Sequence, residues 1–512
     1  MLTRTEKSIK NVKYAIVGQF FGIIVNLISR FVFVKTLPIE FLGLSGLFTN
    51  ILTIFSLTEL GVGTAMSYQL YKPLAENDDE KIQVLMGLYK KIYLIISAII
   101  LILGFFCLPL YPYLINEVPD IENLNLIYSL FVLNTAVSYW FSYKRILVNA
   151  DQKQYVTTYY KYLFYFILNV FQIVLLLLFK NYLLFLVIQI SITFLENIFL
   201  SIKVNKLYPF LRDKTAQTVS KSFLKEMMVN VKYVFFHKFG GVVLNSTDNI
   251  VISKFLGLGF VAIYSNYMLI INALNTVISQ LFNSIIASIG NLDVTSGKKD
   301  MTRVFDRLFF LSFWLHIVCS ICLICLFNPF IELWLGSSYV VSIYVVLALA
   351  FNFYLFGMRK PAMAFREATG NYYSDRFSPI IEAVLNIFFS IILSKYFGLT
   401  GVILGTIISC VCTNLWWEPL VICRKSLNKT IFEYFSVYLK YTFCGIGIAF
   451  LTISLTNLLP NSNIMMFAVK AGVSFVLPNL LLIFLFHKNE YFKFYKTLIF
   501  DKFLKKIINN KK

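Results

Sequence analysis

The chain carries the stretch NVKYAIVGQFFGIIVNLISRFVFVKTLPIEF at residues 11–41 and repeats it, without a gap, as NVKYVFFHKFGGVVLNSTDNIVISKFLGLGF at residues 230–260. The identical pairs include Asn11/Asn230, Val12/Val231, Lys13/Lys232, Tyr14/Tyr233, Phe20/Phe239, Gly22/Gly241, Asn26/Asn245, Val32/Val251, Lys35/Lys254, Leu37/Leu256 and Phe41/Phe260. Later in each half, ILNVFQIVLL from Ile167 aligns with VLNIFFSIIL from Val384 at nearly the same offset. Since similarity at a fixed spacing is the signature of an internal repeat, we predict two copies of a unit longer than one helix.

Both copies lie in an unusually apolar chain: 58% of the 512 residues are hydrophobic, 14% are charged, and the mean hydropathy is +0.73. Such a composition is typical of a membrane protein. A helix needs roughly 20 apolar residues to cross the hydrocarbon core, and the sequence supplies about fourteen windows of that kind. We predict spans at about 14–34, 42–70, 84–108, 122–146, 156–178, 182–202, 230–253, 258–286, 304–327, 339–358, 378–397, 399–422, 434–457 and 463–486.

The repeat and the spans together predict an all-α integral membrane protein with about fourteen transmembrane helices. Six spans return the chain to the side it left, so two six-helix repeats run parallel and form two lobes around a central cavity, followed by a C-terminal helix pair. The predicted units are residues 1–210, the N-terminal lobe, residues 225–423, the C-terminal lobe, and residues 424–512, spans 13 and 14 with a basic cytoplasmic tail. Two such lobes can rock to open the cavity to either side, which favours transport; a duplicated scaffold without a moving cavity is the alternative.

The formal net charge of +20 follows from membrane topology. Lysine and arginine gather on alternate junctions, with 39 of the 46 on the side that holds both termini. By the positive-inside rule this side is the cytoplasm, so both termini are predicted to be cytoplasmic. The basic excess therefore gives no support to nucleic-acid binding, and it suits contact with anionic membrane lipids.

Catalytic and metal-binding patterns do not stand out in the sequence. Cys319, Cys322 and Cys325 are spaced by three within a helix and lack a fourth ligand, so we predict packing residues and no metal site. No G-x-x-x-x-G-K-[ST] motif occurs, and ELGVGTA at Glu59 to Ala65 indicates a break in a helix rather than a nucleotide loop. We predict no catalytic residues, no cofactor and no enzyme activity.

Four charged residues inside the predicted spans are the candidate site residues, because an ionisable group near the bilayer centre costs about 2.5 kcal/mol or more. Arg30 in span 1 and Lys238 in span 7 are predicted to line the cavity and bind an anionic head group such as a pyrophosphate. Glu59 in span 2 and Asp248 in span 7 are predicted to be cavity acids or ion-coupling residues. The alternative for Arg30 is a structural bridge to Glu59.

Three further charged residues, Glu196, Arg359 and Glu382, lie toward the predicted cytoplasmic ends of their spans. Since a charge at that depth reaches water, we predict that these three side chains are solvated rather than buried.

Three stretches carry a resemblance to a known family: LPIEFLGLSGLFTNILTIFSLTELGVGTAMSYQLYKPLAENDDEKI from Leu37, STDNIVISKFLGLGFVAIYSNYMLI from Ser246, and SPIIEAVLNIFFSIILSKYFGLTGVILGTIIS from Ser378, followed by WWEP. In order and spacing they resemble the Wzx-type oligosaccharide flippases, polysaccharide biosynthesis and export proteins of the multidrug/oligosaccharidyl-lipid/polysaccharide exporter superfamily. The likeness covers nearly the whole chain. It implies alternating access by two lobes and a cationic cavity, and Arg30 fits the arginines that are characteristic of the first helices in these cavities.

The resemblance implies a flippase for undecaprenyl-pyrophosphate-linked oligosaccharide repeat units of a capsule, O-antigen or similar surface polysaccharide, in the bacterial cytoplasmic (inner) membrane. In similar precursor flippases the last two helices shape a groove for the polyprenyl tail, which would be spans 13 and 14 here. The implied partners are membrane lipids, H⁺ or Na⁺, and the polysaccharide polymerase and glycosyltransferases of the pathway. The alternative is a cation-coupled multidrug or small-cation antiporter of the same superfamily, which Glu59 and Asp248 keep open.

Overall fold

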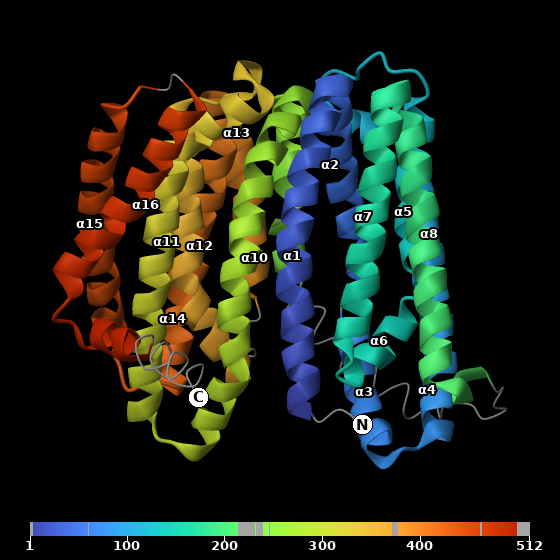
Figure 1. Cartoon of the computed structure of the whole chain (residues 1–512), viewed down its shortest axis with the longest axis horizontal. Helices are drawn as coiled ribbons and strands as arrows, with labels where there is room; N and C mark the ends of the chain where they lie inside the picture. Colours follow the sequence, from blue (N-terminus) through green and yellow to red (C-terminus); the bar gives the residue numbers. More distant parts are fainter. Residues whose placement is uncertain are drawn as a thin grey trace, which may run out of the picture. The chain divides into compact units, whose positions relative to one another are not determined.

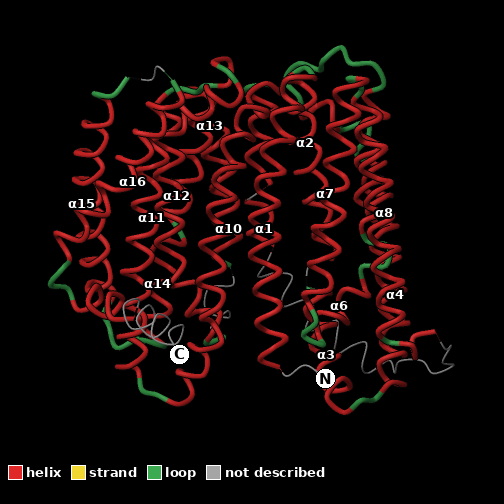
Figure 2. Tube along the Cα trace, viewed as in Figure 1, coloured by secondary structure: helices red, strands yellow, loops and turns green. Residues whose placement is uncertain are grey.

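The computed structural model describes residues 4–59, 61–212, 231, 239–244, 246–370, 377–460 and 463–498. Within these ranges the regular elements are all helices and no strand occurs (Figures 1 and 2). The predicted all-α class is therefore confirmed. In the second copy of the repeated stretch, residues 230, 232–238 and 245, Lys238 among them, fall outside the described residues.

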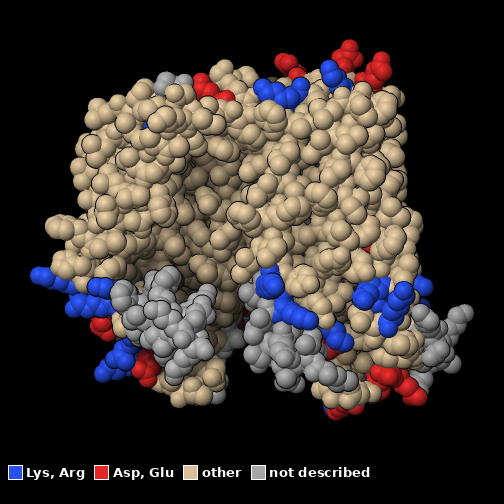
Figure 3. All heavy atoms as spheres, in the orientation of Figure 1, with Lys and Arg blue, Asp and Glu red and all other residues tan. Residues whose placement is uncertain are grey.

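Ten helices in the described part are long and apolar enough to cross a membrane, or up to eleven when a bent pair is taken as one span. They are α1 (Arg4–Thr36), α4 (Asp79–Phe106), α7 (Gln154–Phe179), α8 (Tyr182–Leu207), α10 (Leu258–Thr295), α11 (Lys298–Leu335), α12 (Ile343–Ala368), α13 (Ser378–Cys412) with α14 (Asn414–Lys425), α15 (Ile431–Asn457) and α16 (Ile464–Phe486). On the face seen in Figure 3, Lys and Arg gather near the helix ends, and the band between is almost free of charge. The chain is thus a multi-pass membrane protein, while the count of about fourteen spans stays a prediction.

The long element α13 is folded back on itself at Gly398, whose φ of 56° and ψ of −133° are not helical. Across the turn, the Asn386 amide donates to the Thr406 hydroxyl at 2.8 Å, and the Ser390 hydroxyl donates to the Val402 carbonyl at 3.1 Å. A Cβ at position 405 would overlap Ser390, so only glycine lets the two segments approach this closely. Two antiparallel segments therefore correspond to the predicted spans 378–397 and 399–422.

Two other predicted spans are interrupted. The first consists of α2 (Ile39–Phe55), the 3₁₀ turn η1 (Ser56–Glu59) and α3 (Val62–Glu76), with Gly61 in the left-handed region at φ 85°. This confirms the helix break predicted at ELGVGTA. The second consists of α5 (Leu124–Ser138) and α6 (Tyr143–Ala150), which are bent by 40°. Because each break exposes helix ends, both create polar positions within otherwise apolar segments.

By their contacts the residues form two compact units, Met1–Ser265 and Asn266–Lys512, divided inside α10. The predicted lobes, residues 1–210 and 225–423, come from the sequence repeat and stay a prediction.

Aromatic clusters fill the interior of each unit. In the first unit, Phe48 of α2 packs edge-on against Tyr111 and Tyr128, with ring centroids 5.3 and 5.0 Å apart. In the second unit, Phe313 of α11 stacks on Tyr441 of α15 at 4.7 Å. Since each such ring buries about 150–250 Å² of surface, these contacts hold the helices of each unit in register.

Candidate functional site

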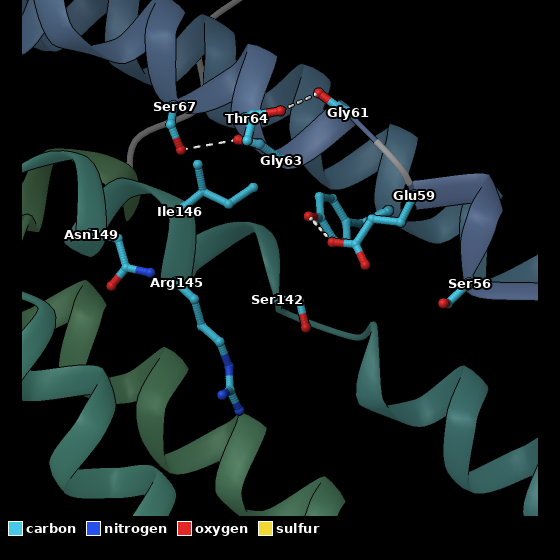
Figure 4. Close-up of a pocket in the computed structure, with 11 residues that line it drawn as sticks. Ser56, Glu59, Gly61, Gly63, Thr64, Ser67, Ser142, Arg145, Ile146 and Asn149 are labelled. Atoms are coloured by element: carbon cyan, nitrogen blue, oxygen red, sulfur yellow. Dashed lines mark hydrogen bonds between the residues drawn. The ribbon is translucent and has the colours of Figure 1, made fainter. Parts of the chain in front are cut away.

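A polar pocket of about 500 Å³ lies in the first unit, where the two interrupted spans face each other (Figure 4). The break between α2 and α3 supplies one wall, α6 supplies another, and α4 adds Tyr93. The lining consists of Ser56, Glu59, Gly61, Gly63, Thr64, Ser67, Tyr93, Ser142, Arg145, Ile146 and Asn149. Discontinuous helices bring polar groups into the membrane in this way, which is a common construction of binding sites in transporters.

Glu59, the last residue of η1, places its carboxylate in this pocket. The Tyr93 hydroxyl donates to Glu59 Oε1 at 2.6 Å. In the described part of the chain no ion pair involves Glu59, so the predicted alternative of a bridge between Arg30 and Glu59 is not found there. The role of Glu59 as a cavity acid remains a proposal.

The serine and threonine hydroxyls of the pocket donate to nearby backbone carbonyls, which leaves their oxygen lone pairs available as acceptors. Figure 4 shows two of these bonds as dashed lines. The four bonds run from Ser56 to Thr53 (2.6 Å), from Thr64 to Gly61 (3.0 Å), from Ser67 to Gly63 (2.9 Å) and from Ser142 to Ser138 (2.6 Å). The side-chain oxygens of the pocket thus form a set of hydrogen-bond acceptors.

Arg145 of α6 also lines the pocket, and the sequence did not single it out. It extends away from Glu59 (Figure 4) and binds Glu196 at 2.6 Å and Asn197 at 3.0 Å, both on α8. Glu196, predicted to be solvated, is instead half-buried in this pair. The apolar run after Arg145, which includes Ile146, was the sequence signal that α6 is buried rather than part of a cytoplasmic loop.

Arg30 lies two turns before the end of α1 and is half-buried. The hydroxyls of Tyr165 on α7 and Tyr182 on α8 lie close enough to interact with it electrostatically. Among the residues that the structure describes, no carboxylate forms an ion pair with Arg30 and no hydrogen bond engages its guanidinium. Arg30 is therefore a membrane-embedded cation whose charge is not neutralised by the described chain.

Asp248 lies in the helical residues 246–250, where it accepts a hydrogen bond from Tyr264 of α10 at 3.0 Å and makes further contacts. Lys238, the second predicted cation, lies outside the described residues. Among the described residues no hydrogen bond or ion pair joins Glu59 and Asp248. Which of the four share a site stays a prediction.

The second unit contains a buried ionic cluster that the sequence analysis missed. Arg359 of α12 binds Glu418 of α14 through Nε and Nη2, each at 3.0 Å, and Glu382 of α13 through Nη1 at 3.2 Å. Arg366 also reaches Glu418, at 3.4 Å. These side chains are 6% exposed or less. The prediction that Arg359 and Glu382 are solvated is wrong, because they neutralise each other inside the helix packing.

An apolar groove of about 490 Å³ lies between α15 and α16 in the second unit. Its lining is almost entirely aliphatic: Leu455, Leu459, Gly472, Val473, Val476, Leu477 and Leu480. A surface of this kind accepts a hydrocarbon chain and offers nothing to a polar ligand.

Solved structures with the same fold are transporters. The lipid II flippase MurJ in an inward closed conformation matches with a TM-score of 0.67 and 17% identity, over 93% of this chain and 99% of that chain. A multidrug resistance MATE family transporter of the MOP superfamily, in an inward-facing conformation, matches with a TM-score of 0.62 and 16% identity, over 78% and 94%. The Vibrio cholerae MATE transporter VcmN, as a mutant, matches at 0.58 and 12%, over 84% and 99%.

No family model and no curated protein matches the sequence. At the identities of the solved structures the likeness shows the fold alone, and this fold is shared by the MurJ flippase and the MATE transporters.

Proposed function

We propose that the protein is a flippase that moves undecaprenyl-pyrophosphate-linked oligosaccharide repeat units across the bacterial cytoplasmic membrane. The observation that carries the proposal is Arg30, a half-buried cation in an apolar helix without an ion-pair partner in the described chain. A guanidinium does not lose its proton to escape such a site, so its charge needs an anion. The pyrophosphate of a lipid-linked sugar presents the paired oxygens that the guanidinium fork binds.

The groove between α15 and α16 supports a lipid-linked substrate rather than a free one. It lies on the helices that correspond to predicted spans 13 and 14, and its aliphatic lining suits a polyprenyl tail. Burying a hydrocarbon chain there gains about 0.8 kcal/mol for each CH₂ group.

The remaining parts of the proposal rest on the sequence. Lys238 is the second cation of the head-group site, both termini are cytoplasmic, and the two lobes alternate around a central cavity. The polysaccharide polymerase and glycosyltransferases of the same pathway supply and consume the substrate.

The test is export of surface polysaccharide in cells that lack their own flippase, with membrane abundance measured for each variant. We expect Arg30→Ala to abolish export at normal abundance, and Arg30→Lys to recover little, because lysine lacks the bidentate fork. Lys35→Ala is the matched control, since it removes an exposed cation from the last turn of the same helix. Full export from Arg30→Ala would refute the substrate role.

A cation-coupled multidrug or small-cation antiporter is the second candidate. The Glu59 carboxylate, which has no ion-pair partner in the described chain, favours it, since a cavity acid can exchange a proton or sodium ion for a cationic solute. An antiporter predicts that Glu59→Gln or Asp248→Asn abolishes gradient-driven uptake of an organic cation into sealed vesicles. The flippase predicts no such uptake in the parent chain.

A further inference from the structure

The pocket at the two helix breaks has the chemistry of a specific binding site of its own. Among the described lining residues the only acidic side chain is Glu59, which accepts a hydrogen bond from Tyr93 at 2.6 Å and also interacts with the Tyr139 hydroxyl. A carboxylate has about four acceptor positions, so it can take further donors from a ligand. The neighbouring hydroxyls of Thr64, Ser67 and Ser142 already donate hydrogen bonds to backbone carbonyls.

Among the described lining residues the one cationic side chain, Arg145, is paired outside the pocket through Nη2, while its Nε has no hydrogen-bond partner. Arg145 points toward α8, where Glu196 neutralises it (Figure 4). The charge available to a ligand beside Glu59 is therefore negative, and the available side-chain oxygens are acceptors. A ligand that matches this lining carries a positive charge and several donors.

The volume of the pocket favours an organic ligand over a bare metal ion. A metal ion requires oxygens that converge at about 2.3–2.6 Å, as for calcium, whereas this lining surrounds a space of about 500 Å³. Cavities of about 300–1,000 Å³ hold small organic molecules. Among these, a primary ammonium supplies three donors and no acceptor, and sugar hydroxyls supply further donors.

We propose that this pocket binds a sugar that carries a free, protonated amine, with its ammonium group on Glu59 and its hydroxyls on the surrounding serine and threonine oxygens. The amine part stands on the pocket alone. The sugar part rests on the proposed function, in which an oligosaccharide is the cargo. The consequence is a preference for repeat units with an unacetylated amino sugar.

The experiment measures binding to the purified full chain in detergent, as a ligand-dependent shift of the unfolding midpoint at constant ionic strength. The probes are glucosamine, glucose, N-acetylglucosamine and ethanolamine, so that charge, sugar ring and size vary separately. We expect a saturable shift with glucosamine and none with glucose or N-acetylglucosamine. Glu59→Gln keeps the size of the side chain and should weaken glucosamine binding at least about tenfold, because a hydrogen bond to a charged group is lost.

Glu117→Gln is the matched control, since Glu117 is an exposed acid in a loop of the same unit, and it should bind as the parent does. Ser142→Ala keeps the carboxylate and removes one acceptor, so it tests the pocket even where Glu59→Gln fails to fold, and it should weaken binding severalfold.

Equal shifts with glucose and glucosamine, or unchanged binding by Glu59→Gln, would overturn the proposal. Ethanolamine that binds as tightly as glucosamine would overturn its sugar part. The flippase assignment is tested separately, because binding is measured without transport: normal export from Arg30→Ala rejects the flippase and leaves the amine measurement intact.

Discussion

The Arg359 guanidinium donates two hydrogen bonds of 3.0 Å to the Glu418 carboxylate, from Nε to Oε2 and from Nη2 to Oε1. Glu382 pairs with Arg359 and Arg366 pairs with Glu418, so these four charged side chains meet in the interior of the second unit. The cluster connects three separate helices, α12, α13 and α14. We expect a buried ionic group of this kind to specify which helices pack together.

Removal of one charge from this cluster should be strongly destabilising. Glu418→Gln removes the buried carboxylate that both Arg359 and Arg366 bind, and the expected loss is about 3–5 kcal/mol. The unfolding midpoint and the membrane abundance should both fall. Glu332→Gln, which changes an exposed acid in the same unit, is the control and should leave both unchanged. Wild-type stability of Glu418→Gln would show that the cluster contributes little.

The close helix approach at Gly405 should not tolerate a larger residue. A side chain at this position overlaps the backbone of Ser390, and overpacking of this kind costs about 1–3 kcal/mol or more. Gly405→Val is therefore expected to lower the unfolding midpoint. Gly447→Val on α15 is the counterpart, because a Cβ there meets open space. Similar midpoints for the two variants would contradict the tight hairpin.

Filling the aliphatic groove should block transport without unfolding the protein. A Cβ at Gly472 meets nothing within 4 Å, so Gly472→Leu fits the fold while it occupies the groove. We expect export to drop severalfold at unchanged abundance. Gly447→Leu, an equally open site outside the groove, should export normally. If the two variants export equally, the groove does not hold the lipid tail.

The charge distribution predicts the orientation of each loop. Glu117, in the loop between α4 and α5, should face the outside, and Asp79, at the start of α4, should face the cytoplasm. A cysteine at position 117 should react with an impermeant thiol reagent in intact cells above the level of the parent chain. A cysteine at position 79 should react only after the membrane is opened. The reverse pattern would reject the topology.

The sequence was sufficient for features that depend on local composition. Apolar windows located the long helices, and two glycines close together at Gly61 and Gly63 located the break beside Glu59. Which charged residues pair with each other could not be predicted from the sequence. Arg145 and Glu196 are separated by 51 residues, and Arg359 and Glu418 by 59, so only the packed helices bring them together.

The same limit applies to the candidate site. A carboxylate in an apolar span was enough to select Glu59, because such a charge is costly in lipid. Its hydrogen-bond donor Tyr93 lies on a different helix, 34 residues away, and could not be named from the sequence. The carbonyls to which the Thr64 and Ser67 hydroxyls donate hydrogen bonds depend on where the helix starts, at Gly61, and only the structure defines that start.

The turn at Gly398 also constrains how the chain is inserted into the membrane. One residue with non-helical φ and ψ separates the two segments of α13, so no loop is available to be threaded through the translocon on its own. The pair is therefore expected to enter the bilayer together as a prefolded hairpin, with its serine, threonine and asparagine contacts formed before lipid surrounds them. A ribosome stalled after the first segment alone should hold that segment at the translocon rather than release it into the membrane.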